Sequence, residues 1–421
     1  MAKLIKTPVK GMNDMLPADM RLREHVLTLI KENYARYGFS QIETPCMEHI
    51  ENLTSKQGGE NEKLIFKVMK RGAELERAMQ SEDGELADFG MRYDLTVPLS
   101  RYYACHSAEL PSPFKALQIG NVWRADRPQK GRFRQFTQCD IDILGDDSVL
   151  SEIELLSATS STLQRIFEEA DIHGFTLHIN DRRILRAMAA YAGFAEEDYD
   201  TVFIELDKMD KIGRDGVRVS LLEGGFAEQS VDTYLSLFDG DTSDVRAFCQ
   251  KMTESGTLDG EVLASLETIL ACVRPMVSAD VTIAFDPTLV RGMSYYTGTI
   301  FEVTIDRYNF SIAGGGRYDE MIGKFSGQRV PACGFSIGFE RIVTILKDVQ
   351  AEKNADSARK VAFLLESGMD SAKMQSVFVR AASLRAEGVT VTVQPLKKNA
   401  KFQIDRLAAD GYTEIERIYC H

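Results

Sequence analysis

The stretch 121–142 reads NVWRADRPQKGRFRQFTQCDID, and it decides the fold. Within eleven residues it places five cations in a chain whose formal net charge is -13: Arg124, Arg127, Lys130, Arg132 and Arg134. Pro128 and Gly131 mark a turn between two extended runs, which predicts a strand, a long basic loop and a second strand. Alternation along the second strand puts one set of polar side chains on a common face: Gln138, Asp140 and Asp142, with Phe136. Such a face beside arginines would present hydrogen-bond acceptors and anion-binding groups to one cavity, whereas the plain alternative is a solvated hairpin.

The composition of the whole chain limits what the protein can be. Its 421 residues, 44% of them hydrophobic, predict two to four domains with sizeable cores. No apolar run has membrane-spanning length and the N-terminus lacks a signal segment, so we expect a cytoplasmic protein without a membrane partner. Seven scattered cysteines predict neither disulfides nor structural zinc. The acidic balance argues against broad nucleic-acid binding but allows it at local basic patches.

The first third of the chain predicts helices and short strands. An apolar repeat of four predicts a helix over Pro17–Tyr37, and Gly38–Pro45 is expected to be a short strand. Proline at a strand end suits a segment that meets a partner across an edge. The acidic residues 72–90 predict a surface loop or hairpin tip. Met91–Pro98 is expected to be a short strand leading into a helix over Leu99–Cys105.

Asp94 and Thr96 allow two interpretations. In an extended segment the two side chains share one face and could jointly bind an ammonium group. Alternatively they cap the helix that follows, with Pro98 in its first turn. The residues alone leave both interpretations open.

The rest of the chain predicts a helical insertion, a second set of strands and a small terminal domain. Residues 181–279 form short, acidic, helix-compatible segments that contain no motif for a reaction. Strand character returns at Val281–Phe285, and three glycines at 314–316 allow either close approach of a ligand to the backbone or a tight turn. Residues 357–421 alternate strand and helix and carry ten Lys/Arg against seven Asp/Glu, a net charge of +3. A mildly basic domain on an acidic body suits contact with RNA.

Five stretches occur in the order found in one enzyme family. On these the chain resembles class II aminoacyl-tRNA synthetases, and specifically histidyl-tRNA synthetases. The matches are Gly38–Pro45 (motif 1), Val122–Asp142 (motif 2), Gly334–Arg341 (motif 3) and two histidine-specific signatures, Leu289–Glu302 and Ala313–Asp319. Two departures bear on function. Ser294 stands where the family usually has Asp, which affects the support of Arg291 and Tyr296, and the C-terminal domain is expected to be shortened, which affects anticodon binding.

The resemblance implies an α+β fold. Its centre is a six-stranded antiparallel sheet with flanking helices, to which a helical insertion domain and a small C-terminal α/β domain are added. The implied boundaries are 1–180 for the first part of the catalytic core, 181–279 for the insertion, 280–347 for the second part of the core and 357–421 for an anticodon-binding-like domain. Motif 1 implies a homodimer.

The implied reaction joins L-histidine to ATP, with Mg²⁺, to give histidyl-adenylate and pyrophosphate, followed by transfer to the 3' end of tRNA(His). Catalysis then consists mainly of positioning and of cations placed around the phosphates. The implied catalytic residues are Arg124 and Arg291, both on the α-phosphate, and Arg341 on the adenine or γ-phosphate. Asp126, grouped with Arg124 and Arg341 as ATP-binding, is a candidate for the adenine amino group or for Mg²⁺. No metal site built from protein ligands is expected.

The resemblance also implies the residues that bind the other two substrates. Those for histidine are Asp94, Thr96, Gln138, Asp142, Tyr295 and Tyr296, with the first three on the α-amino group and Asp142 and Tyr296 on the imidazole nitrogens. Those for the tRNA acceptor end are Arg127, Gln129 and Arg134. The alternative function is that of a non-catalytic, histidine-sensing relative, the regulatory subunit of ATP phosphoribosyltransferase. The three catalytic arginines favour the ligase, whereas Ser294 and the shortened C-terminal domain favour the regulator.

Overall fold

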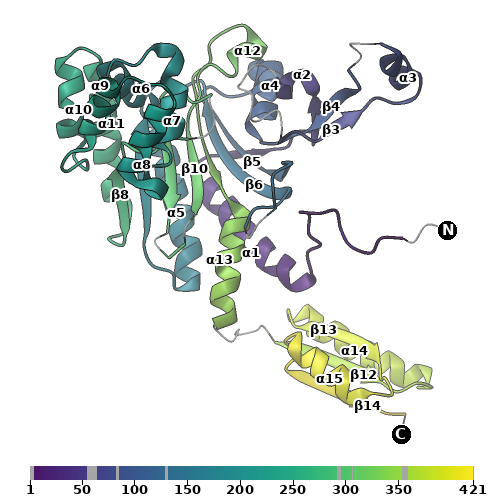
Figure 1. The fold of residues 1–421 in the computed structure, drawn as a ribbon. Coiled ribbons are helices and arrows are strands. Elements are labelled where there is room, and N and C mark those ends of the chain that lie inside the picture. The colour runs from purple at the N-terminus through teal and green to yellow at the C-terminus, as the bar shows by residue number, and fades with distance from the viewer. Residues whose placement is uncertain are drawn as a thin grey trace. The chain divides into compact units, whose positions relative to one another are not determined.

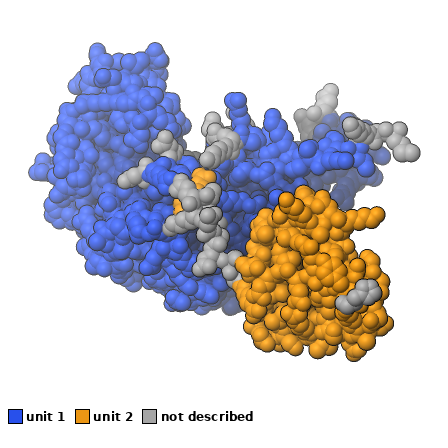
Figure 2. Space-filling model, turned by 90° about the horizontal axis from the view of Figure 1, so that it is seen from below, with its two compact units in different colours: residues 1–347 blue, residues 348–421 orange. Residues whose placement is uncertain are grey.

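The computed structural model describes residues 4–54, 64–81, 85–128, 131–291, 295–305, 307–308, 310–352 and 359–420. The chain divides into two compact units, residues 1–347 and 348–421, which Figure 2 shows in different colours. Each unit has hydrophobic clusters of its own.

The first unit is built on an eight-stranded sheet with the order β1-β5-β6-β11-β10-β9-β7-β8. The central strands from β5 to β7 in this order pair antiparallel, whereas β1 and β8 pair parallel at the two edges. The expected six-stranded antiparallel sheet is therefore confirmed, with one parallel strand added at each edge. The strands are β1 (Ser40–Ile42), β5 (Phe114–Trp123), β6 (Gln135–Leu144), β7 (Phe175–Asp181), β8 (Val281–Phe285), β9 (Thr299–Thr304), β10 (Ser311–Arg317) and β11 (Ala332–Ile337).

Helices pack against one face of this sheet. They are α1 (Pro17–Arg36), α5 (Leu150–Ala170) and α13 (Phe339–Glu352), which Figure 1 shows beside the central strands. Cys139, Ile141 and Ile143 of β6 share one buried cluster with apolar residues of these helices. Because side chains alternate along a strand, Gln138, Asp140 and Asp142 point to the opposite face, as predicted.

A smaller sheet precedes the active-site strands. It has the order β2-β4-β3, with β2 (Met47–His49), β3 (Lys67–Met69) and β4 (Ala87–Met91), and it is accompanied by α2 (Ile50–Thr54) and α3 (Gly72–Gln80). The predicted loop over 72–90 was wrong, because α3 and β4 occupy most of it. The alternative of a hairpin tip was correct in placement, because α3 connects the antiparallel strands β3 and β4. The α3 sequence GAELERAMQ consists largely of good helix formers and buries Ala78, which outweighs its polar composition.

A group of helices connects β7 to β8. Asp181, the last residue of β7, accepts a hydrogen bond from the Arg183 N–H and so caps the first of them. Phe203, Tyr234 and Leu266 belong to the same buried cluster as the central strands, so the helices share the core of the sheet, and Figure 1 shows them gathered beside β8. They are α6 (Arg182–Tyr191), α7 (Tyr199–Leu206), α8 (Met209–Glu223), α9 (Glu228–Leu235), α10 (Val245–Glu254) and α11 (Gly260–Val273).

Short helices complete the first unit. They are α4 (Thr96–His106), α12 (Gly323–Ser326) and single 3-10 turns at Ser107–Glu109, Glu196–Asp198, Ser236–Phe238 and Arg274–Met276. The second unit is a parallel sheet of order β13-β12-β14. Its predicted alternation of strand and helix is confirmed by β12 (Lys360–Leu365), α14 (Ser371–Ala386), β13 (Thr390–Pro395), α15 (Ala400–Ala409) and β14 (Glu414–Ile418). Among the described residues, no helix is long and apolar enough to cross a membrane.

Candidate active site

A polar row crosses the sheet on the face opposite α1 and α5. Residues that pair across neighbouring strands lie side by side, so this row follows directly from the strand registers. It runs through His178, Glu302, Gly314, Ser336, Asp140 and Gln118. Of these, the sequence had placed only Asp140 on this face, and it had offered a role only for Gly314, as one of three glycines that allow a ligand to approach the backbone.

Asp94 lies in the loop before α4 and uses its two carboxylate oxygens differently. Oδ1 accepts a hydrogen bond from the Val97 N–H at 3.1 Å, so Asp94 caps a helix that begins at Thr96. The capping interpretation is therefore correct for Asp94 but not for Thr96, which is the first residue of the helix after Leu95 at the N-cap position, and the predicted extended run through Pro98 was wrong. Oδ2 is buried and has no hydrogen-bond partner among the described residues. Burial raises the pKa of Asp94 to about 6, although the Val97 N–H and Arg124 oppose this.

Asp142 faces Tyr318, a residue to which the sequence had assigned no role. The Tyr318 hydroxyl donates to Asp142 Oδ1 at 2.6 Å, while the buried Oδ2 has no partner in the described part of the chain. A Cβ atom on Gly334 would lie 2.0 Å from Asp142 Oδ1, so only glycine leaves room for this carboxylate. Burial raises the pKa of Asp142 to about 7, although Tyr318 opposes this and Asp94 reinforces it. The only sequence signal for Tyr318 was its place in the 313–319 signature.

Gln138, Ser336 and Asp140 form a chain of hydrogen bonds. Gln138 Nε2 donates to Ser336 Oγ at 3.0 Å, and Ser336 Oγ donates to Asp140 Oδ1. Gln138 Oε1 is buried and, within the described ranges, has no partner. Burial, reinforced by the Asp142 carboxylate, raises the pKa of Asp140 well above its usual range. Asp140 and Ser336 are therefore site residues that sequence reasoning missed.

Two adjacent tyrosines lie near Asp94. The rings of Tyr295 and Tyr296 lie 4.8 Å apart between centroids, and their hydroxyls interact. Tyr295 also hydrogen-bonds to Thr96 and lies within electrostatic reach of Asp94. The structure thus brings the predicted histidine-binding residues of α4 and of the 289–302 signature together. Ser294, on which the sequence analysis commented, lies outside the described residues.

Arg124 and Arg291 approach the same region with their guanidinium groups. Arg124 Nε donates to the Tyr93 carbonyl at 2.9 Å, and its Cζ lies 5.1 Å from the centre of the Phe136 ring. Arg291 forms an ion pair with Glu302. A Cβ atom on Gly314 would lie 2.5 Å from Arg291 Cζ, so this glycine lets the arginine lie flat on the sheet.

Arg341 completes the cationic side. Its Nη1 donates to the Ser311 carbonyl and, at 3.2 Å, to Ser311 Oγ, while its Cζ lies 5.4 Å from the centre of the Phe310 ring. The pKa of Arg341 is lowered first by burial. Other charges act on it as well, namely the opposing carboxylate of Glu302 and the guanidinium groups of Arg132, Arg291 and Arg124. The three predicted catalytic arginines therefore converge.

The loop after β5 holds the remaining predicted residues. Asp126 receives two hydrogen bonds from Arg132, at 2.9 and 3.0 Å, so this ion pair must open before Asp126 can contact another ligand. Arg134 Nε donates to the Asp126 carbonyl at 3.0 Å, and Arg127 is exposed. Gln129 lies outside the described residues. In the described ranges, no group of three or more acidic, His or Cys residues could hold a metal ion.

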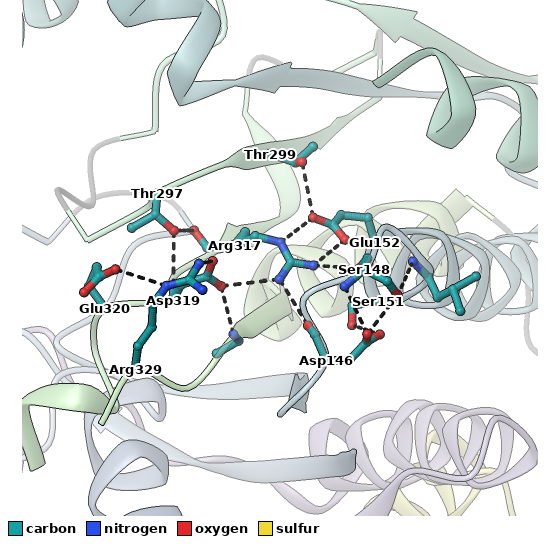
Figure 3. Close-up of polar contacts among 12 residues, drawn as sticks. Asp146, Ser148, Ser151, Glu152, Thr297, Thr299, Arg317, Asp319, Glu320 and Arg329 are labelled. Carbon is teal, nitrogen blue, oxygen red and sulfur yellow. Dashed lines mark hydrogen bonds and ion pairs between the residues drawn. The ribbon is translucent and has the colours of Figure 1, made fainter. Parts of the chain in front are cut away.

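A second buried polar group, here called the Arg317 cluster, is drawn in Figure 3. Its centre is Arg317, which donates two hydrogen bonds of 2.6 Å to Glu152 on α5 and one of 3.3 Å to Asp319. The same guanidinium also donates to the carbonyls of Asp146 and Ser148, at 3.2 and 3.0 Å.

The Arg317 cluster holds the segments that carry the pocket tyrosines. Asp319 N–H donates to Thr297 Oγ1 at 3.1 Å, and Thr297 N–H donates to the Arg317 carbonyl at 2.8 Å, which anchors the residue after Tyr296. Tyr318, between Arg317 and Asp319, points instead to Asp142. The glycines at 314–316 lie inside β10, so the tight-turn interpretation was wrong.

Comparisons with known proteins agree with this geometry. The family model described as histidyl-tRNA synthetase matches residues 11–342. A histidine–tRNA ligase of Leifsonia xyli subsp. xyli is 43% identical over 415 residues, covering 96% of this chain and 94% of the relative. The chain belongs to the histidyl-tRNA synthetase family. A family member from Flavobacterium johnsoniae, also a histidine–tRNA ligase, is 34% identical over 94% of this chain and 88% of its own.

Solved structures show the same architecture. The histidyl-tRNA synthetase of Nostoc sp. PCC 7120 superimposes with a TM-score of 0.78 at 26% identity, over 99% of this chain and 92% of that one. A Bacillus halodurans C protein described as an ATP phosphoribosyltransferase regulatory subunit/histidyl-tRNA synthetase gives a TM-score of 0.75 at 20% identity, over 99% of both chains. At that identity the second likeness shows the fold alone.

Proposed function

We infer that the chain is a histidine–tRNA ligase, which activates L-histidine with ATP and transfers it to tRNA(His). Its relatives of that name are 33–43% identical over most of its length. The observation that carries the mechanism is a combination of two features of the site. Asp94, Gln138 and Asp142 each keep a buried acceptor without a partner among the described residues, and Arg124 and Arg291 lie within electrostatic reach of Arg341.

The acceptors suit the two nitrogen-bearing ends of histidine. We propose that Asp94 Oδ2 and Gln138 Oε1 bind the α-ammonium group, with Thr96 and Tyr295 beside them. Asp142 Oδ2 would accept from one imidazole nitrogen, and Tyr296 would contact the other. Buried groups left unpaired by the wrong ligand discriminate by about 10⁴ or more against analogues that lack the hydrogen-bonding atom.

The arginines suit the phosphates. A carboxylate oxygen of histidine attacks the α-phosphorus, the bond from that phosphorus to the bridging oxygen breaks, and pyrophosphate leaves with the electron pair. Negative charge builds on the oxygens around the α-phosphorus, so cations fixed there lower the barrier. We propose that Arg124 and Arg291 hold the α-phosphate, and that Arg341 lies against the adenine or the γ-phosphate.

Magnesium would arrive with ATP and offset the charge of its phosphates. The carboxylate of Asp126 is already engaged by Arg132, so we assign no step to a magnesium ion held by this residue. For the second substrate, the loop that carries the exposed Arg127, together with Gln129 and Arg134, is proposed to face the tRNA acceptor end. Residues 357–421, with their net charge of +3, are proposed to contact the anticodon arm, as a cytoplasmic tRNA-charging enzyme requires.

A homodimer is proposed through motif 1. Strand β1, within motif 1, is an edge strand of the large sheet. Met47 and Phe89 of the adjoining small sheet are 52% and 40% exposed, and burial against a second copy would remove this apolar surface from water. A single-subunit mass in sedimentation equilibrium would exclude this assembly.

Histidine-dependent ATP–pyrophosphate exchange tests the proposed ligase. Purified protein with Mg²⁺ and saturating histidine should exchange label, and the Arg291→Ala variant should do so about a hundredfold more slowly, because one fixed cation at the α-phosphate is lost. The variant also controls for a contaminating host enzyme. Arg218→Ala removes an arginine paired with Glu228 and Asp232 in the insertion and should exchange at the full rate. Absence of exchange above background would refute the ligase.

The regulatory subunit of ATP phosphoribosyltransferase was the alternative function. A solved structure whose description names such a subunit is similar at 20% identity, which shows the fold alone, and that description also names histidyl-tRNA synthetase. Arg124, Arg291 and Arg341 have a use in adenylation and none in histidine sensing alone, so the ligase accounts for more of the site.

A further inference from the structure

Ser336 links two residues of β6 from its place on β11. Its Oγ accepts from Gln138 Nε2 at 3.0 Å and donates to Asp140 Oδ1. At the other end of the amide, Gln138 Oε1 is buried and, in the part of the chain that the structure describes, has no partner. The three side chains therefore form a hydrogen-bond chain that is open at the Gln138 end.

The direction of this chain follows from what each group can donate. When the Asp140 carboxylate is ionised it only accepts, so the Ser336 hydroxyl hydrogen then points to Asp140, and the Ser336 oxygen is left to accept from Gln138. Gln138 then turns its NH₂ group to Ser336 and its carbonyl oxygen away from it. An amide oxygen is the end that can accept hydrogen bonds from an ammonium group, whereas an NH₂ group in its place would repel one.

We propose that Asp140 and Ser336 are positioning residues that fix the Gln138 amide with its oxygen toward the α-ammonium group of histidine. This inference rests on the proposed role of Gln138 in histidine binding. Neither Asp140 nor Ser336 touches the substrate. They determine whether the substrate meets the oxygen or the NH₂ group of the Gln138 amide, two groups of similar size. With the oxygen toward the substrate, the site prefers a ligand that carries a cationic amine.

The charges around Asp140 fit this role. Burial and the carboxylates of Asp142 and Asp94 raise the pKa of Asp140, whereas Arg124 lowers it. A cation bound nearby also favours the ionised carboxylate. Arrival of the ammonium group therefore stabilises the ionised form of Asp140, which is the form that orients Gln138 to receive it.

Removing the link should weaken binding of only those ligands that carry the ammonium group. We expect Ser336→Ala to raise the Kd and KM for L-histidine about five- to tenfold, with kcat little changed, because one hydrogen bond that orders the site is lost. Binding of 3-(imidazol-4-yl)propionate, which keeps the imidazole and carboxylate but lacks the ammonium group, should change less than about twofold. Ser160→Ala, at another buried serine, controls for loss of a hydroxyl and should alter neither affinity.

A double-mutant cycle tests whether the effect passes through Gln138. Added to Gln138→Ala, Ser336→Ala should cost no further affinity for histidine, because there is no amide left to orient. Equal weakening for histidine and the analogue, or an additive loss in the cycle, would overturn the proposal. Asp140→Asn, which keeps the size of the side chain, repeats the test should Ser336→Ala lower the melting temperature. If the proposed ligase function is wrong, the unsubstituted protein will show no ATP–pyrophosphate exchange. The binding measurements do not depend on exchange, so the two proposals can fail separately.

Discussion

The Arg317 cluster and the proposed histidine pocket, made of Asp94, Gln138 and Asp142, are neighbouring buried polar groups that differ in how completely they are paired. Arg317 and Glu152 expose 9% and 3% of their side chains, and they share two hydrogen bonds of 2.6 Å. Asp94, Gln138 and Asp142 each keep one buried oxygen without a partner among the described residues. Tyr318 donates to Asp142 of the pocket, whereas its two neighbours in sequence, Arg317 and Asp319, bond to each other in the Arg317 cluster.

This difference separates structural from functional polar residues. A buried polar atom without a partner costs about 1–3 kcal/mol, so a fold retains several in one place only where a ligand can satisfy them. The Arg317 cluster carries no such cost and holds the β10 end in place. The Arg317 cluster thus holds one side of the 313–319 signature in place, next to Tyr318, which donates to Asp142.

The largest expected effect is a loss of stability when one partner of the Arg317–Glu152 pair is removed. Glu152→Ala leaves the Arg317 charge buried without its carboxylate, and we expect the free energy of unfolding to fall by about 3–5 kcal/mol. Urea denaturation followed by circular dichroism measures it. The matched control is Glu154→Ala on the same helix, whose carboxylate pairs with Lys115 at 2.6 Å but is 36% exposed. That change should cost less than about 1 kcal/mol, and equal losses for the two variants would remove the distinction between the clusters.

In the proposed histidine pocket, a substitution should change the KM for histidine more than it changes stability. Asp142→Asn keeps an acceptor for Tyr318 but removes the buried charge, so we expect stability to stay level or rise slightly. The KM for histidine should rise about tenfold to a hundredfold, because an amide replaces the charged acceptor of the imidazole. Exchange kinetics and thermal melts of the same preparation give both quantities. Asp147→Asn, at an exposed neighbour, should change neither. A loss of stability with an unchanged KM would make Asp142 structural.

Sequence patterns were sufficient for the parts of the fold that depend on periodicity. The alternation along β6 was correct because one face meets the α1 and α5 core and the other does not. The strands and helices of the second unit were correct for the same reason. The helix α3 was missed because its polar composition was given more weight than its helix propensity, and the start of α4 was missed because Asp94 caps it.

The candidate site was predictable only in part. Ordered motifs pointed to Arg124, Arg291 and Arg341, which do converge. Partners that come from distant strands were not visible in the sequence, because pairing of Ser336 with Asp140 depends on the β11–β6 register and not on local spacing. The same holds for Glu302, which pairs with Arg291.

The smallest expected effect is a pH dependence of stability to which Asp142 and Asp94 contribute. Burial raises the pKa of Asp142 to about 7 and that of Asp94 to about 6, both above the value of about 3.9 in an unfolded chain. Between pH 8 and pH 6 the folded protein therefore takes up protons that the unfolded chain does not, so stability should increase as the pH falls. His178, whose pKa is also raised, adds a contribution of the same sign. Comparison with Asp142→Asn, which retains His178, isolates the share of Asp142.

Thermal melts without ligand should therefore show a melting temperature that rises on acidification, with a smaller rise in Asp142→Asn. The expected difference is about 1 kcal/mol, on the order of 1–2 °C. Saturating histidine should flatten the slope of the unsubstituted protein, because the bound cation holds the carboxylates in their ionised form. Parallel curves for the two proteins would mean that Asp142 is already ionised in the empty pocket. Water molecules, rather than protons, would then satisfy the unpartnered carboxylate oxygens. The difference from the Arg317 cluster would be that its polar atoms are paired within the protein and those of the pocket are hydrated.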